Sequence, residues 1–341
     1  MAASICTSDG AQPTPAEMSA QRVKAVMSTK RIRKNYYILR VPGEYNIPQV
    51  QVWRIGDGVA NRVDVSGEMY PYKAVPGETI WDTLRRLNPF WFEPECLFHE
   101  TDLGPGEYYP RMWRPPFPTF NPRSSPEWNP SAQEETGIAD IIAIAHGQLT
   151  TLTRQLGRIC QTVQPKGQNL YAFGHDIRNL LILTCTEVEN QWRNVLVANG
   201  VTQQRYNTKD YVRLRDPMKL DEYAVMFPNY PLLPAFRPYD GWNTDKPTCS
   251  LGWYDAYNDV KHNRETQFGR ATLHHVFEAI SACVIMMAAQ FGPVEGLGQG
   301  SELRSFFHLS GIPDWPLSQY YIPPFGKQPS LAHFDFKTAT A

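Results

Sequence analysis

The residues best suited to chemistry in this sequence lie between positions 253 and 275, where aromatic, basic and acidic side chains are dense. Tyr254, Asn258 and His262 follow one another at intervals of four, so a helix would place them on one face. Lys261 borders that face. An imidazole titrates near neutral pH and can both accept and donate a proton. We therefore expect His262 to form the centre of a polar cluster.

A second polar stripe occurs earlier, in residues 172–199. Arg178 and Glu189 are eleven residues apart, which corresponds to about three turns along one face of a helix. Two interpretations stay open. The stripe is either a structural layer, in which Arg178 or Lys261 pairs with a carboxylate, or a functional polar cluster between two helices. The partner carboxylate would be Glu187 or Glu189.

Three long helices must position these side chains. Apolar residues recur at steps of three and four through residues 136–163, 172–199 and 252–291, and this spacing predicts amphipathic helices that pack on one another. The second helix is apolar on several sides, which predicts a central position. An aromatic and proline-rich insertion, residues 201–250, separates the second helix from the third.

The rest of the chain divides where its composition changes. The expected units are a disordered leader (1–21), a small α+β unit (22–103), a proline-rich connector (104–134), a helical domain with the insertion (135–292) and an extended tail (293–341). Four large aromatic residues in the connector predict that it lies on an apolar surface. Short strands are expected in the tail at 320–322 and 333–336. The fold class is α+β, mainly an antiparallel helical bundle.

Composition excludes several classes of protein. Lys and Arg number 33 against 34 Asp and Glu, so the protein carries no overall basic coat for nucleic acid. The six cysteines form no C-x-x-C pair, which favours buried free thiols in a reducing cytoplasm over a disulfide scaffold or a zinc site. No export signal is expected, and the apolar runs are shorter than the roughly 20 residues of a membrane span. No phosphate-loop, dinucleotide or metalloprotease motif occurs, so no cofactor or metal is expected.

The helical half resembles a known superfamily. The segment RNLLILTCTEVENQW, followed by WYDAYNDVKHNRETQFGRATLHHVFEAI, is similar to HEPN domains over about residues 136–291. This resemblance implies an antiparallel helical bundle that is often dimeric. Many members cleave RNA without a metal through an R-x(4–6)-H motif, and others are inactive and bind nucleotides, RNA or proteins.

The resemblance assigns candidate catalytic roles to His262, Arg270 and His275. The last two fit R-x4-H, although Ala271 stands where the family often has a polar residue. On one straight helix, five residues turn by about 140°, so Arg270 would lie closer to His274 than to His275. Arg264 is a further candidate beside His262. Metal-free cleavage of RNA needs a base for the 2′-hydroxyl and a cation for the phosphorane, and His and Arg supply these.

A weaker similarity covers residues 72–88, where YKAVPGETI and a later LN are similar to the opening of LysM modules. It implies a surface-binding or phage-tail-associated unit, which would require a complete strand–helix–helix–strand unit near residues 70–115. Three functions therefore stay open. The protein is an RNA-associated HEPN-like protein that could act as an endoribonuclease in bacterial defence or stress, a non-catalytic interaction or scaffold protein, or a LysM-like module. RNA, a second copy of the chain or another protein is the expected partner, in the cytoplasm.

Overall fold

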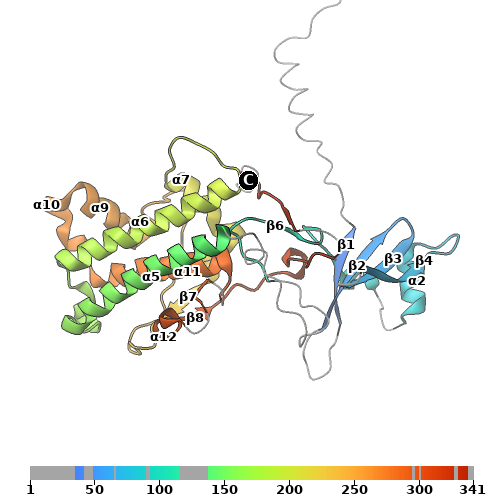
Figure 1. The fold of residues 1–341 in the computed structure, drawn as a ribbon, viewed down its shortest axis with the longest axis horizontal. Coiled ribbons are helices and arrows are strands. Elements are labelled where there is room, and N and C mark those ends of the chain that lie inside the picture. The colour runs from blue at the N-terminus through green and yellow to red at the C-terminus, as the bar shows by residue number, and fades with distance from the viewer. Residues whose placement is uncertain are drawn as a thin grey trace, which may run out of the picture. The chain divides into compact units, whose positions relative to one another are not determined.

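The structure, a computed structural model, describes residues 35–41, 49–64, 67–89, 93–115, 137–293, 296–298, 301–325 and 329–336 (Figure 1). The predicted leader, residues 1–21, lies outside these ranges. Among the described residues, helices and strands are both abundant, so the mixed α+β class is confirmed.

A five-stranded antiparallel sheet forms the N-terminal part. Its strands are β1 (Tyr36–Val41), β2 (Gln49–Gly56), β3 (Val59–Asp64), β4 (Gly67–Lys73) and β5 (Phe98–Glu100), in the order β4-β3-β2-β1-β5. Asp57 and Gly58 connect β2 to β3 with positive φ angles of 54° and 71°. An Asp-Gly pair with two positive φ angles suits a tight hairpin whose twist matches that of its strands.

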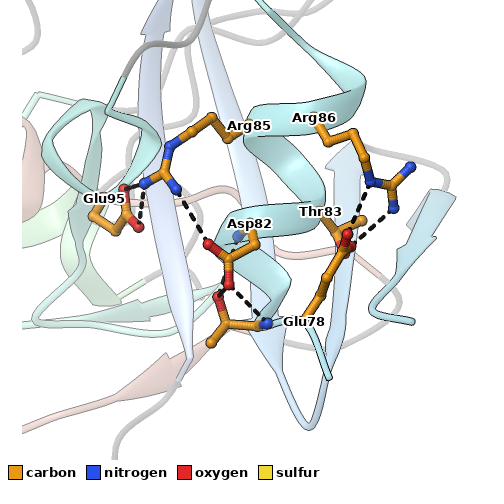
Figure 2. Close-up of polar contacts among 7 residues, drawn as sticks. Glu78, Asp82, Thr83, Arg85, Arg86 and Glu95 are labelled. Atoms are coloured by element: carbon orange, nitrogen blue, oxygen red, sulfur yellow. Dashed lines mark hydrogen bonds and ion pairs between the residues drawn. The ribbon is translucent and has the colours of Figure 1, made fainter. Parts of the chain in front are cut away.

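Helix α2 (Ile80–Leu87) covers one face of this sheet, and the short α3 (Pro94–Leu97) follows it. Thr79 and Asp82 form the predicted capping box, with the backbone N–H of Asp82 donating to Thr79 Oγ1 at 3.1 Å. On the outer side of α2, Arg86 pairs with Glu78, and a second pairing joins Arg85 to Glu95 (Figure 2). These pairs are half-exposed and stabilise the helix only weakly.

The order β4-α2-α3-β5 reproduces the strand–helix–helix–strand sequence of a LysM-like unit. However, β4 and β5 lie at opposite edges of the five-stranded sheet and do not pair with each other. The predicted order of elements near residues 70–115 is therefore present, and the LysM-like similarity stays a prediction.

The opposite face of the sheet is covered by the C-terminal tail. Ile322, which is fully buried, packs with Ile38, Val52 and Val63. The predicted strand at residues 320–322 is wrong, because this segment follows the 3-10 helix η6 (Leu317–Gln319) and contains only an isolated bridge at Tyr321. The strand predicted at 333–336 is also wrong, since β9 is Ser330–Leu331 and pairs in parallel with β6 (Glu107–Tyr108).

The start of the connector is ordered against the helical domain, as predicted. The backbone N–H of Trp113 donates to the carbonyl of Ala289 at 2.8 Å. Arg114, only 4% exposed, donates to the carbonyl of Pro217 at 2.7 Å and stacks over Trp315. The other three aromatic residues of the connector, Phe117, Phe120 and Trp128, lie outside the described residues.

Four long helices make up the helical domain: α5 (Gly137–Thr162), α6 (His175–Ala198), α9 (Gly252–His262) and α11 (Leu273–Phe291). The first two confirm the predicted helices at 136–163 and 172–199. Helix α11 lies at the centre and packs against α5, α6 and α9 (Figure 1). It is long and apolar enough to cross a membrane, but 83% of it is buried inside the protein, as in the core helix of a soluble protein.

The prediction of one helix over 252–291 is wrong. Helix α9 ends at His262, with Asn263 as its C-cap, and α10 (Arg264–Gln267) and the 3-10 helix η5 (Phe268–Arg270) follow before α11 begins. Thr272 is the N-cap of α11 and accepts from the backbone N–H of His275 at 3.3 Å. The N–H of Leu273 donates to the carbonyl of Ala172, which fixes the break against the segment before α6.

The insertion 201–250 is part of the core. Its residues Tyr239 and Trp242 are fully buried and pack around Trp192 of α6. The remaining short elements are η2 (Gly167–Tyr171), α7 (Thr208–Tyr211), η3 (Val212–Leu214), α8 (Arg215–Met218), η4 (Leu220–Glu222), β7 (Ala224–Met226), α12 (Glu302–Phe306) and β8 (His308–Gly311). Strands β7 and β8 pair antiparallel, which ties the insertion to the tail.

Candidate functional site

A polar layer lies between α6 and α9, where the sequence predicts one. The hydroxyl of Tyr254 donates to Glu189 Oε1 at 2.5 Å, and that of Tyr257 approaches Glu189 Oε2 at 3.5 Å. Lys261 Nζ donates to the Tyr257 hydroxyl at 2.7 Å. Burial, followed by the negative charge of Glu189, raises the pKa of Tyr254 well above its usual value. Both tyrosines are therefore neutral hydrogen-bond donors near pH 7.

Arg178 does not pair with Glu189. Its guanidinium donates to the side-chain oxygen of Asn179 at 3.2 Å and to the carbonyl of Val260 at 3.4 Å, and its buried Nε has no hydrogen-bond partner among the described residues. Asn258 donates to the carbonyl of Tyr254 on its own helix at 2.9 Å. Neither Arg178 nor Lys261 forms the predicted ion pair with Glu187 or Glu189 among the described residues, and the layer is held instead by the hydrogen bonds of Tyr254 and Tyr257.

His262 is not the centre of this layer, contrary to expectation. It lies in the last turn of α9 and is exposed. No hydrogen bond or ion pair joins it to another described residue. The side chain of Arg264, its predicted neighbour in the cluster, lies outside what the structure describes.

Arg270 and His275 do come together, through the break between α9 and α11. Nδ1 of His275 lies 2.8 Å from the backbone carbonyl oxygen of Arg270. The guanidinium of Arg270 reaches back to α9, where it pairs with Asp255 at 2.9 Å and also with Asp259. On a straight helix Arg270 would have been nearer to His274, so the turn η5 produces the pairing with His275.

The hydrogen bond to the carbonyl assigns the proton of the neutral His275 ring to Nδ1 and leaves the lone pair on Nε2. Burial is the main cause that lowers the pKa of His275, so the ring is neutral near pH 7. A neutral imidazole with a free Nε2 lone pair can act as a general base. The side chain of Arg270 is 38% exposed, so its guanidinium can still be reached from solvent.

His274 forms a different pair, with its Nε2 located 3.7 Å from Glu278 Oε2. Burial lowers the pKa of His274, and burial raises the pKa of Glu278 to about 7. His274 therefore does not join Arg270 and His275 in one hydrogen-bonded cluster.

The sequence interpretation missed three carboxylates of this region, Asp255, Asp259 and Glu278. Asp255 and Asp259 are four residues apart in the helix that was already singled out, and this spacing signals a pair on one face. The sequence does not show that Arg270 pairs with them, because this contact depends on the break in the helix at residues 263–272. In the described part of the chain, no group of three or more His, Cys, Asp or Glu residues could hold a metal ion.

All five described cysteines are free thiols, as their spacing predicts. Cys185 and Cys283 are buried, but Cys160 is only half-buried and Cys96 and Cys249 are exposed, so the prediction of burial is wrong for these three. The chain matches no known family model, no curated protein and no solved structure.

Proposed function

We propose that the helical domain is a HEPN-like, RNA-associated module that cleaves RNA without a metal, with Arg270 and His275 as its site. The observation that carries this proposal is the break between α9 and α11, since it brings the ring of His275 into a hydrogen bond with the backbone carbonyl of Arg270, the other residue of the R-x4-H pattern. A straight helix would have kept them apart.

The chemistry follows from the two side chains. Nε2 of the neutral His275 takes the proton of a ribose 2′-hydroxyl, and the 2′-oxygen attacks the adjacent phosphorus. The bond from phosphorus to the 5′-oxygen breaks, which leaves a 2′,3′-cyclic phosphate, and the leaving 5′-oxygen takes the proton back from the His275 imidazolium. The exposed part of the Arg270 guanidinium donates to the phosphate oxygens as negative charge develops on them. A two-fold homodimer would bring two such pairs together, and sedimentation of the full chain tests that part of the proposal.

The second candidate is a non-catalytic helical interaction protein, and a specific observation favours it. Two carboxylates already occupy the guanidinium of Arg270, so the local charge is negative before any phosphate arrives. In this alternative, Arg270 fixes η5 to α9, and the domain binds RNA or protein without cleaving it.

Incubation of the purified full chain with a generic RNA in the presence of EDTA separates the two candidates. For a nuclease, Arg270→Ala and His275→Ala each abolish cleavage and leave the thermal melt close to that of the wild type. His262→Ala is the matched control, because this histidine is exposed and outside the cluster, and it should cleave normally. Wild-type protein that binds RNA without cleaving it supports the second candidate.

A further inference from the structure

A groove with a volume of about 680 Å³ lies between the C-terminal half of α5 and the N-terminal half of α6. Arg158 of α5 lines it, together with Asp176, Asn179 and Leu183 of α6 and Phe173 just before α6. This volume is within the usual range of small-molecule sites, which is about 300–1,000 Å³. The lining combines a cation, a carboxylate, an amide and apolar surface.

The cation of the groove is available for a ligand. Arg158 is exposed and forms no ion pair with another described residue. One turn earlier on the same helix, Arg154 has its charge occupied, because it pairs with Glu302 at 2.7 Å. The two arginines therefore provide a matched comparison, one paired outside the groove and one unpaired inside it.

The groove also offers an aromatic surface. Phe173 is 58% exposed, so part of its ring surface is open to solvent. Its ring contacts Phe268 edge-on, with 6.1 Å between the ring centroids, and the His175 ring lies 5.0 Å from Phe268 on the same side. Phe268 belongs to η5, which also contains Arg270, so this wall of the groove is contiguous with the segment of the candidate site.

We infer that this groove binds a nucleotide, with its base stacked on Phe173, its phosphate on Arg158 and its ribose hydroxyls on Asp176. An exposed aromatic face stacks any base, guanidinium recognises phosphate oxygens, and a carboxylate accepts from the hydroxyls of ribose. The amide nitrogen of Asn179 is a donor for the edge of a base, while its oxygen already accepts from Arg178. The ligand is a free nucleotide or a nucleotide unit of an RNA strand, since both present this chemistry.

Other ligands fit less well. An apolar helix laid in the groove would bury Arg158, Asp176 and Asn179 without partners, which is costly. A bare phosphate would leave Phe173 exposed and would meet the negative charge of Asp176. The inference rests on the proposed function only in naming RNA as one source of the nucleotide, and binding in the groove does not require cleavage.

Calorimetric titration of the full chain with AMP, and fluorescence anisotropy with a labelled RNA hexamer, test the inference. Arg158→Ala and Phe173→Ala should each weaken binding by about 10-fold or more. Arg154→Ala, and Tyr171→Ala at another exposed aromatic residue that does not line the groove, should stay within about twofold of the wild type. Asp176→Asn should reduce the preference for AMP over dAMP.

The outcomes separate this inference from the proposed function. Binding of AMP and RNA that both groove variants weaken supports a general nucleotide site, and binding of RNA alone supports a subsite for a strand. Failure of both probes to bind, or binding that ignores Arg158→Ala and Phe173→Ala, overturns the inference. That result would leave the proposed cleavage by His275 unaffected. Conversely, groove-dependent binding without any cleavage supports the nucleotide site and refutes the proposed nuclease activity.

Discussion

Replacement of Glu189 by alanine tests whether the polar layer between α6 and α9 is structural. The carboxylate is the acceptor for the hydroxyl of Tyr254, whose residue is only 4% exposed. After the substitution this hydroxyl has no other acceptor among the contacts of the layer. Tyr257 is affected less, because its contact with Glu189 is long and Lys261 also contacts its hydroxyl.

The expected loss follows from these contacts. A hydrogen bond to a charged group contributes about 1.5–3 kcal/mol, and a buried donor without a partner costs about 1–3 kcal/mol. The two values describe the same lost contact from two sides and do not add. With the side-chain methylenes that are also removed, Glu189→Ala should lower the free energy of unfolding by about 2–4 kcal/mol. Glu189→Gln retains an acceptor oxygen and should cost about 1 kcal/mol.

Urea denaturation followed by tryptophan fluorescence measures these differences. Asn190→Ala is the matched control on the same helix, since its contact with Asn194 is exposed, and it should change stability by less than about 0.5 kcal/mol. A double-mutant cycle with Tyr254→Phe should give a coupling energy of about 1–3 kcal/mol. A loss below about 0.5 kcal/mol in Glu189→Ala would refute a structural layer.

The pH dependence gives a second readout of the same layer. The pKa of Tyr254 in the folded protein is raised above its usual value of 10.0, by burial first and by Glu189 next. A tyrosine with a raised folded pKa stabilises the protein fully below the unfolded pKa, and this contribution declines as the pH rises further. Stability should therefore fall above about pH 10, and Glu189→Ala should make this fall shallower.

Four other substitutions test the packing and the charges. Asn199→Ala should lower the free energy of unfolding by about 2–3 kcal/mol in urea denaturation, because the buried amide donates to the carbonyls of Pro110 and Val195 and accepts from the N–H of Phe334. The control is Asn194→Ala, which removes an exposed hydrogen bond to Asn190 and should cost less than about 0.5 kcal/mol. Glu278→Gln should gain stability over the wild type as the pH rises from 4.5 to about 7, by up to about 2 kcal/mol, because the carboxyl ionises in the unfolded state in that window while the folded protein keeps it protonated. The same difference in stability between Glu278→Gln and the wild type at pH 5 and at pH 8 would contradict this. Leu181→Ala or Ile280→Ala should each cost about 2–5 kcal/mol, and an unchanged thermal melt would refute their place in the core.

The sequence predicts the elements whose own residues determine them. Helices α5 and α6 follow from apolar spacing because each buries one continuous stripe, and the cap of α2 follows from Thr79 and Asp82. The break after α9 has no comparable local signal. No proline occurs between residues 253 and 292, and the break is fixed by contacts with residues 172 and 173, which are distant in sequence.

Long-range packing also explains the errors in the tail. The pattern of its residues predicts two short strands. In the structure, the hydroxyl of Tyr321 instead donates to the carbonyl of Met112 and accepts from the N–H of Tyr109, more than two hundred positions earlier. Such contacts satisfy backbone groups of the connector without forming a ladder. Apolar alternation alone does not distinguish a strand from an extended segment that is held in this way.

The candidate site was predictable in its residue types and not in its pairings. Arg270 and His275 are visible as a motif, whereas their contact depends on η5, and the carboxylates of Arg270 depend on the path of the chain back to α9. His262 illustrates the opposite error. Helical periodicity assigned it to the face of Tyr254 and Asn258, but α9 ends there and the side chain remains in solvent.

The double pairing of Arg270 does not by itself prevent it from binding a phosphate. Its side chain is 38% exposed, and those of Asp255 and Asp259 are 26% and 33% exposed, so water screens all three charges. At about 4 Å, a pair of unit charges in such surroundings contributes about 1–4 kcal/mol, between the values for water and for a protein surface. A phosphodiester also carries one negative charge and accepts two parallel hydrogen bonds from a guanidinium. Exchange of one carboxylate for a phosphate is therefore nearly balanced in energy, and the remaining carboxylate would keep the guanidinium oriented toward α9.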